Sequence, residues 1–427
     1  MFEGLGAIRR PFYGWWIVGV AFLSLFLSGG VGTAFSVLLP VMAEQLGWPY
    51  SSLVGAASLG VVTGAVVGPA IGRVVDARGA RLVLALGAAL TAITVAATGF
   101  VKEPWQFYLA FGLVGGAARA AMMNVAPVGM IANWFVRRRA VASGVAAMGP
   151  PASSLVLPPI IAIAGTAFSW RWAWLGLGTA IGALALPPVV LLVRRRPEDL
   201  GLEPDGGESP NVGQAPSPAR TDEWTLHEAI HSRAFWGVAA SMALIGVMPH
   251  TVFLFLPASF RAQGLTDTAA AATLSLMGFA QVVSRVALWT PLVARLGSVQ
   301  RALMLWGGLL TLSALLLAVA HGEVAGYLAS GFLGLAMGAN LVLQLLVWPE
   351  YFGRRAVGAI SGVAHLLGGL AGAAGPVAAA ALVDLTGDYT LLYLSMAGVV
   401  LAGLILQLAV GRPEKTGPRL PRLTRSI

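Results

Sequence analysis

Residues 82–101 of the chain read LVLALGAALTAITVAATGFV and carry no charged side chain over twenty positions. A helix needs about 20 mostly apolar residues to cross a hydrocarbon layer about 30 Å thick, so this stretch is long enough to span a membrane. The remaining sequence agrees, since 57% of the 427 residues are hydrophobic, 11% are charged and the mean hydropathy is +0.80. Soluble proteins have about a quarter of their residues charged. The composition therefore indicates a membrane protein.

Further apolar blocks of similar length precede and follow this stretch, and polar residues separate them. The blocks are continuous rather than alternating, which favours membrane helices over membrane strands. We therefore predict an all-α membrane protein with twelve transmembrane helices. The predicted spans cover residues 13–40, 51–75, 82–101, 105–133, 140–164, 172–193, 234–260, 270–294, 302–320, 324–347, 356–383 and 389–410.

A polar segment divides the twelve predicted spans into two sets of six. Residues 194–233 are rich in Pro, Gly, Glu and Asp, a composition that neither crosses a membrane nor builds a core. We predict that this segment is a surface linker. The chain then consists of an N-terminal six-helix unit over residues 1–193, the linker over 194–233, a C-terminal six-helix unit over 234–411 and a basic tail over 412–427.

The positions of Lys and Arg predict the orientation in the membrane, because cytoplasmic loops carry an excess of both. With the N-terminus inside, most of the 27 basic residues fall in inner segments, and the outer segments carry only Lys102, Arg171 and Arg261. We predict a multi-pass protein of the cell (inner) membrane with both termini and the linker in the cytoplasm. Topology then explains the net charge of +9 without nucleic-acid binding. The absence of cysteine excludes disulfides and thiolate metal sites.

Two arginines remain inside predicted spans. Arg119 lies about 21 Å into the fourth span and Arg285 about 22 Å into the eighth, at a rise of about 1.5 Å per residue. No Asp or Glu is predicted at that depth in any span. An arginine at the centre of a membrane helix costs about 2.5 to 3.5 kcal/mol on insertion scales, so an interaction must offset it. Either carbonyls of neighbouring helices satisfy each guanidinium, or a water-filled cavity brings it an anion such as a carboxylate.

Other polar side chains are predicted at similar depth. Gln281 lies one helical turn before Arg285, and Asn340 and Gln344 have the same spacing on the tenth span. His250 and His365 are the histidines within spans, and histidine titrates near neutral pH. Each residue is a candidate for substrate or proton binding. Each is equally compatible with a hydrogen-bonded packing role between helices.

The loop before the opening stretch carries the first recognisable motif. Residues 72–81, GRVVDARGAR, resemble the G-x-x-x-D-x-x-G-x-R loop of the major facilitator superfamily. In that superfamily the acid participates in the inner gate, so the resemblance implies gating roles for Asp76 and Arg78. The equivalent loop of the second half, residues 291–301, has no acid. We therefore expect the gate in the first half.

A second motif is more specific. Residues 134–144, WFVRRRAVASG, resemble the [Y/W]-F-x-K-R-R-x-x-A-x-G motif of the monocarboxylate transporter family, which adds Arg138 to the predicted gate. Similar pieces shared with the related oxalate/formate exchangers are YGWW at 13–16, GW at 47–48, YFGRR at 351–355, His250 and Arg285. The resemblance covers nearly the whole chain.

This resemblance implies two six-helix bundles around a central site, alternating access and the carriage of small carboxylates. Arg285 corresponds to the eighth-span arginine that holds the substrate carboxylate in the family. His365 lies on the eleventh span, where the oxalate exchanger has a second cation. The chain departs from the animal members at two points, because Gln281 replaces an acid and the first span lacks a lysine. Their proton-coupling residues are therefore missing, while Arg119 is an additional cation.

These observations predict a secondary transporter for a small organic anion, a mono- or dicarboxylate, driven by proton symport or by exchange against a counter-anion. One alternative is a drug/proton antiporter, although the chain lacks the paired glycines of such exporters after Pro150 and has no acid at mid-depth. Another alternative is a non-transporting membrane sensor on the same fold. An enzyme is not expected, because no catalytic cluster, metal-ligand set or cofactor-binding loop is visible.

Overall fold

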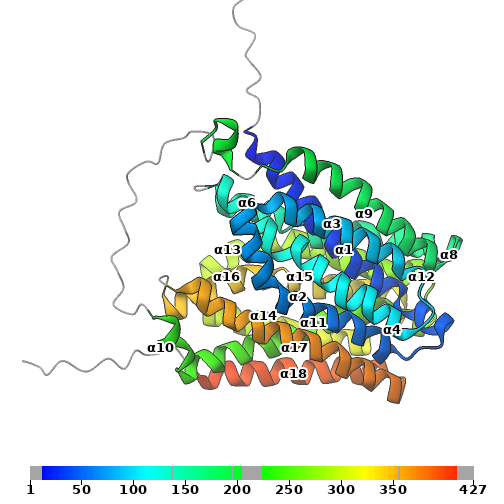
Figure 1. Ribbon diagram of the computed structural model, residues 1–427. Helices are drawn as coiled ribbons and strands as arrows, with labels where there is room; N and C mark the ends of the chain where they lie inside the picture. The colour runs from blue at the N-terminus through cyan, green and yellow to red at the C-terminus, as the bar shows by residue number, and fades with distance from the viewer. Residues whose placement is uncertain (1–11, 136–137, 195, 204–223, 354–355, 411–427) are drawn as a thin grey trace, which may run out of the picture.

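The computed structural model of the chain describes residues 12–135, 138–194, 196–203, 224–353 and 356–410. Within these ranges the chain consists of helices and connecting turns, with no strand (Figure 1). Helices satisfy their own backbone N–H and C=O groups, which is necessary where no water is available to pair with them. The predicted all-α membrane fold is confirmed.

The N-terminal half contains the first six predicted spans. The fourth span is one helical run built from five short pieces, and the fifth bends between two helices. The elements are α1 Gly14–Leu46, α2 Tyr50–Arg78, α3 Ala80–Thr98, then α4 Pro104–Phe107, η1 Tyr108–Val114, α5 Gly115–Ala120, η2 Ala121–Val125 and α6 Ala126–Trp134, then α7 Arg139–Ala146 with α8 Gly149–Ala167, and α9 Trp170–Leu192.

The C-terminal half repeats this plan. A short helix, α10, precedes it, and the eighth span again contains a π-helical piece. The elements are α10 Leu226–Ile230, α11 Arg233–Ala262, α12 Asp267–Val283 continued by η5 Ser284–Trp289 and α13 Thr290–Leu296, α14 Val299–Val319, α15 Gly322–Met337, α16 Ala339–Phe352, α17 Val357–Thr386 and α18 Tyr389–Val410.

Eleven helical stretches within the described ranges are long and apolar enough to cross a membrane. The remaining predicted span, residues 105–133, lies in the helical run that contains η1 and η2. π-helical turns inside α-helices are frequent at functional sites. Here they lie on both sides of the helix that carries Arg119.

The helix ends reveal how each half is threaded. In Figure 1 the starts of α1 and α11 and the ends of α9 and α18 lie at the same end of the molecule. Each half therefore crosses the molecule an even number of times, as six spans require. We call this end the inner end and the opposite one, where α1 ends and α2 begins, the outer end.

The ends of the predicted linker are helical. Pro197–Leu200 forms a single 3-10 turn after the first half. At the other side, Trp224 is buried and its backbone N–H donates to the carbonyl oxygen of Phe352 at 3.1 Å, which fixes the start of α10 on the C-terminal half. Residues 204–223 and the predicted tail 412–427 lie outside the described residues.

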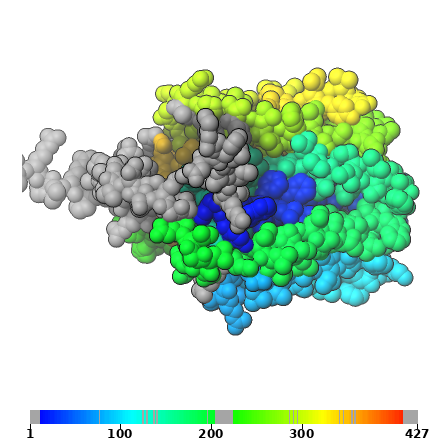
Figure 2. All heavy atoms as spheres, turned by 90° about the horizontal axis from the view of Figure 1, so that it is seen from above, coloured from blue at the N-terminus to red at the C-terminus, as the bar shows by residue number. Residues whose placement is uncertain are grey.

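Three helix pairs make most of the contacts between the described parts of the two halves. Helix α1 packs on α11, α2 on α17 and α8 on α12. Figure 2 shows α1 in dark blue between α8 and α9, with the yellow-green α12 along α8. The α8–α12 contact is close because Gly278 has no side chain; a Cβ there would lie 2.8 Å from the backbone nitrogen of Leu155. Small residues allow membrane helices to approach in this way.

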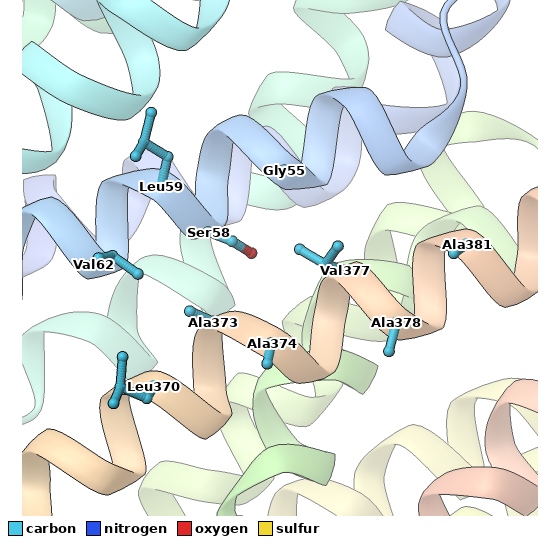
Figure 3. A pocket seen from close by; sticks show the side chains of 10 residues that line it. All are labelled: Gly55, Ser58, Leu59, Val62, Leu370, Ala373, Ala374, Val377, Ala378 and Ala381. Carbon is cyan, nitrogen blue, oxygen red and sulfur yellow. The ribbon is translucent and has the colours of Figure 1, made fainter.

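The α2–α17 pair encloses a shallow apolar groove of about 560 Å³. Figure 3 shows Ser58 and Val62 of α2 facing Ala373 and Val377 of α17 across it. The lining is mostly Ala, Gly and Val, so few side chains interlock the two halves along this pair. The polar contacts that hold the pair lie at its outer end.

Asp384, near the end of α17, accepts hydrogen bonds from the backbone N–H groups of Tyr50 and Ser51, both at 2.8 Å. These are the first N–H groups of α2, and the residue before them, Pro49, provides no side-chain cap. The first four N–H groups of a helix have no partner inside it. Asp384 therefore caps α2 from the other half of the molecule, where the positive end of the helix dipole also favours a carboxylate.

A second polar cluster joins the outer ends of α1 and α11. The guanidinium of Arg261 lies 2.8 Å from a carboxylate oxygen of Glu44 in the other half and 2.8 Å from one of Asp267. About two helical turns before Glu44 on α1, the buried hydroxyl of Ser36 donates to the carbonyl oxygen of Phe253 on α11 at 2.7 Å. The two halves are thus held together by polar contacts at the outer end.

Replacement of Asp384 by Ala is expected to open the outer end more often. Loss of a helix cap costs about 0.5 to 2 kcal/mol, which changes a two-state ratio by roughly twofold to thirtyfold. Because the chain has no cysteine, a single Ser36→Cys substitution reports opening through its rate of reaction with a membrane-impermeant maleimide. We expect the rate to rise by about that factor.

Asp388→Ala is the matched control, because the Asp388 carboxylate accepts a hydrogen bond from Thr390 in its own turn. Its labelling rate should equal that of the parent. Equal rates for both variants would show that the cap does not hold the outer end closed.

Candidate functional site

Arg285 joins the two halves. It lies in η5, is partly buried, and its Nη1 donates to the carbonyl oxygen of Ala147 at 3.1 Å. Ala147 follows α7 in the N-terminal half. The fold thus places the positively charged guanidinium of Arg285, in the C-terminal half, against a backbone oxygen of the N-terminal half.

The Ala147 carbonyl is available because of a proline. In a continuous helix this oxygen would accept from the N–H of residue 151, which is Pro151 and has none. The next carbonyl, of Met148, does receive the N–H of Ala152, at 3.0 Å. The proline therefore frees one carbonyl at the bend between α7 and α8, and Arg285 occupies it.

The backbone around Arg285 is tightly enclosed. Gly338, before α16, packs so closely that a Cβ there would lie 2.9 Å from the Arg285 nitrogen and would collide with the Ser284 hydroxyl. Gln281 lies one turn toward the outer end and is partly buried; its carbonyl accepts from the Ser284 hydroxyl at 3.3 Å. The segment that carries the guanidinium is therefore fixed by packing. A role for Gln281 in binding stays a prediction.

Arg119 lies inside the N-terminal half. Its Nη2 donates to the carbonyl oxygen of Phe111 at 3.1 Å, and the guanidinium carbon lies 4.4 Å from the centre of the Phe111 ring. Among the described residues, its buried Nη1 has no hydrogen-bond partner. A cation over an aromatic ring is attracted by the ring, by about 0.5 to 2 kcal/mol. These contacts fit the packing alternative in part, and the predicted contact with substrate stays a prediction.

Two glycines make room for Arg119. A Cβ at Gly60 of α2 would lie 2.8 Å from Nη2, and one at Gly115 would lie 3.2 Å from Nη1. The fourth span approaches α2 through the same glycine, since Gly116 packs on Gly60. The guanidinium thus lies where α2 and the fourth span meet.

Three of the predicted residues form one hydrogen-bonded row, which we call the amide–imidazole relay. The side-chain nitrogen of Gln344 donates to the Asn340 side-chain oxygen at 2.7 Å, and the oxygen of Gln344 lies 3.2 Å from Nε2 of His365. The other ring nitrogen, Nδ1, lies 2.6 Å from the carbonyl oxygen of Ser361. Gln344 is part-buried on α16, and His365 is exposed on α17. The contact between Gln344 and His365 was not predicted from the sequence, in which the two residues are 21 positions apart.

His250 is exposed in the middle of α11, although its neighbours on both sides, Pro249 and Thr251, are buried. Its Nδ1 lies 2.8 Å from the carbonyl oxygen of Gly246. The ring therefore has one nitrogen engaged with its own helix and an open side. Its predicted role stays a prediction.

The predicted gate lies at the inner end. Arg78 is the exposed last residue of α2, and Arg138 is exposed just before α7. Gly79 follows Arg78 with φ of +85°, a conformation that favours glycine, which explains the glycine of the loop motif. The side chain of Asp76 lies outside the described residues. An inner ionic network stays a prediction.

Comparison with known proteins identifies the class. The described helices form two halves that pack mainly along three helix pairs, and most of the helices are long and apolar enough to cross a membrane. The model of the Major Facilitator Superfamily matches residues 21–376, which is most of the chain. The chain therefore belongs to this superfamily of membrane transporters.

Its relatives narrow the group further. The chain is 28% identical to monocarboxylate transporter 11 of Mus musculus over 415 residues, which cover 94% of this chain and 88% of the relative. It is 27% identical to monocarboxylate transporter 13 of Bos taurus, with 92% and 88% covered. The sequence resemblance to monocarboxylate transporters is thus confirmed at low identity.

Solved structures confirm the fold alone. The nucleoside transporter NupG matches with a TM-score of 0.73 at 14% identity, over 94% of this chain and 100% of that one. A bacterial homolog of the human lysosomal transporter Spinster matches with a TM-score of 0.67 at 15% identity, over 95% and 96%.

Substitution of Gly60 by Ala is expected to destabilise the protein. The new methyl carbon would lie 2.8 Å from Nη2 of Arg119, so the guanidinium would have to leave Phe111 or the helices would have to separate. Overpacking of this kind costs about 1 to 3 kcal/mol. A lower melting temperature of the detergent-purified protein would report the change.

Gly68→Ala is the matched control on the same helix, because a Cβ there meets nothing within 4 Å. It should melt at or above the temperature of the parent. Equal melting temperatures for Gly60→Ala and Gly68→Ala would show that the close approach of α2 to Arg119 does not contribute to stability.

Proposed function

We propose that the protein carries a small organic anion with at least one carboxylate across the membrane by alternating access, coupled to a proton or to a counter-anion. The observation that carries the proposal is the contact of Arg285 with Ala147 of the opposite half. A guanidinium presents a planar set of donors that matches a carboxylate, and it stays charged at any physiological pH.

Alternating access gives this contact a natural role. If the halves rock apart around a central site, the Arg285–Ala147 distance changes and the guanidinium loses its backbone oxygen. A substrate carboxylate then provides both a hydrogen-bond acceptor and the opposite charge, whereas a carbonyl provides only the acceptor. No Asp or Glu is positioned by the sequence to compete for this charge at mid-depth.

The relatives support the proposed substrate class. Those compared above are named monocarboxylate transporters, and the similarity extends over more than nine-tenths of this chain. Arg119 would add a second cation and make a dicarboxylate acceptable as well. The proposal assigns the chain no catalytic reaction, cofactor, metal or nucleic-acid partner.

The proposed location is the inner cell membrane, with both termini and the linker in the cytoplasm. Its support is the common inner end of the helices that begin and finish each half, together with the Lys and Arg residues of the loops at that end. The outer end, closed by Asp384 and Arg261, would then face away from the cytoplasm.

Arg285→Gln is expected to abolish carboxylate transport. A hydrogen bond to a charged group contributes about 1.5 to 3 kcal/mol, so the loss of one or two of them should reduce uptake at least about tenfold. Purified protein in proteoliposomes would be tested for uptake of radiolabelled lactate, pyruvate and oxalate. Thermal stabilisation by each anion gives an independent test, since binding at 100 times Kd adds about 2.7 kcal/mol.

Arg295→Gln is the matched control, because Arg295 is an exposed arginine nearer the inner end of the same span. It should retain uptake. Undiminished uptake by Arg285→Gln would refute the role of this arginine. Resistance to cationic drugs without any carboxylate flux would instead favour a drug/proton antiporter, and a lack of any flux would favour a sensor.

A further inference from the structure

One proton of the His365 ring is fixed by the backbone. Nδ1 lies 2.6 Å from the carbonyl oxygen of Ser361, and a carbonyl oxygen only accepts hydrogen bonds. Nδ1 therefore carries a hydrogen in both the neutral and the charged ring. The atom that gains or loses a proton is Nε2, which faces the amide of Gln344 at 3.2 Å.

The charge of the ring sets the direction of the whole amide–imidazole relay. When Nε2 is protonated it donates to the Gln344 oxygen, and the Gln344 nitrogen donates to the Asn340 oxygen at 2.7 Å. When Nε2 is neutral it must accept, so the Gln344 amide turns its nitrogen toward the ring. An amide nitrogen and oxygen are nearly equal in size, so both directions fit the same space.

Protonation of His365 changes which group of Asn340, at the other end of the relay, is left free to form a further hydrogen bond. In the protonated state the Asn340 oxygen is engaged and its NH₂ group is left to donate. In the neutral state the Asn340 nitrogen donates to Gln344, and its oxygen is left to accept. An anion is favoured by donors and by positive charge, so the protonated state favours an anion on both counts.

The relay ends close to the proposed anion site. Gly338, two residues before Asn340, lies against the Ser284 side chain and the Arg285 backbone, where a Cβ would come within 2.9 Å of the Arg285 nitrogen. Helix α16 thus begins on the segment that carries the guanidinium. A change at Asn340 occurs next to that segment.

The other ionisable groups around α17 lie mostly near helix ends. His250 of α11 is the one placed toward the middle of a span, and Asp384 lies at the outer end of α17 itself. The remaining charged or titratable residues on helices packed against α17 belong to the end regions of α2, α10, α11, α16 and α18: Tyr50, Arg73, Asp76, Arg78, His227, Glu228, His231, Arg233, Arg261, Glu350, Tyr351, Tyr389 and Tyr393. The described group in contact with Nε2 is the amide of Gln344.

From this geometry we infer that His365 carries the coupling proton of a proton–anion symport, and that Gln344 and Asn340 transmit its charge state to the anion site. The inference rests on the proposed transport of an organic anion. One proton from water binds Nε2 as one anion binds, and both leave on the other side, so no other bond forms or breaks. Because linkage is reciprocal, a bound anion favours the proton as much as the proton favours the anion.

His365→Gln separates coupling from transport. Its amide can still pair with Gln344, but it cannot carry a proton. Full-length protein in proteoliposomes with an entrapped pH dye would be supplied with radiolabelled lactate or oxalate. The parent should acidify the vesicle lumen as the anion enters, and in the variant we expect acidification per anion transported to fall about tenfold or more, a ratio that a general loss of transport would leave unchanged.

His321→Gln is the matched control, because its ring contacts the carbonyl oxygen of Val319 in an exposed outer turn. It should acidify the lumen like the parent. Gln344→Glu tests the relay by a shift rather than a loss. A carboxylate beside Nε2 favours the charged ring, so the pH of half-maximal uptake should rise by about one unit or more.

The outcomes separate the two proposals. Anion uptake that is lost in Arg285→Gln, with proton movement unchanged in His365→Gln, would overturn the inference and leave the proposed function intact. Anion exchange by the parent without any lumen acidification would do the same. If the parent moves neither lactate nor oxalate, the proposed function fails and the inference fails with it.

Discussion

In the interior of a membrane, each backbone N–H and C=O must find its partner within the protein. This constraint makes the described chain helical, and it gives meaning to the few places where a helix cannot satisfy itself. Pro151 leaves the Ala147 carbonyl without a helical partner, and Arg285 takes it from the other half. Pro49 leaves the start of α2 without a cap, and Asp384 provides one, again from the other half. In both cases a backbone group of the N-terminal half that lacks a partner in its own helix is hydrogen-bonded by a side chain of the C-terminal half.

These two contacts differ in what they permit. The carbonyl of Ala147 offers a dipole to a full positive charge, so an anion that reaches Arg285 can improve on it. The carboxylate of Asp384 pairs with two N–H groups at once, and Arg261 reinforces it nearby with Glu44 and Asp267. The outer end is thus held by charged groups, while Arg285, further along the interface, is the residue that we propose to bind the transported anion. A transporter that works by alternating access needs both kinds of contact. One stabilises a closed conformation, and the other can be replaced by a contact with the substrate.

Much of the architecture could be predicted from composition and spacing, because hydrophobic length alone decides whether a helix crosses a membrane. The twelve spans, the break after residue 193 and the mid-depth positions of Arg119 and Arg285 follow from that. The interruption of the fourth span by π-helical turns could not be predicted in this way. It occurs where Gly60 and Gly116 allow α2 to approach the span closely, and that approach is a contact between helices. The contact of Arg285 with the Ala147 carbonyl was not predicted either, although Pro151, four residues after Ala147, shows in the sequence that this carbonyl lacks its usual helical donor.

The sequence by itself determined that this is a helical membrane protein in two halves with two arginines inside its predicted spans, because those properties depend on residue type and on distance along the chain. Only the tertiary structure decided which side chains meet. It placed Arg119 against Phe111 within one half, Arg285 against the opposite half, and His365 in a row with Gln344 and Asn340. Contacts between helices depend on rotation, bends and missing N–H groups, and no pattern along a single helix contains that information.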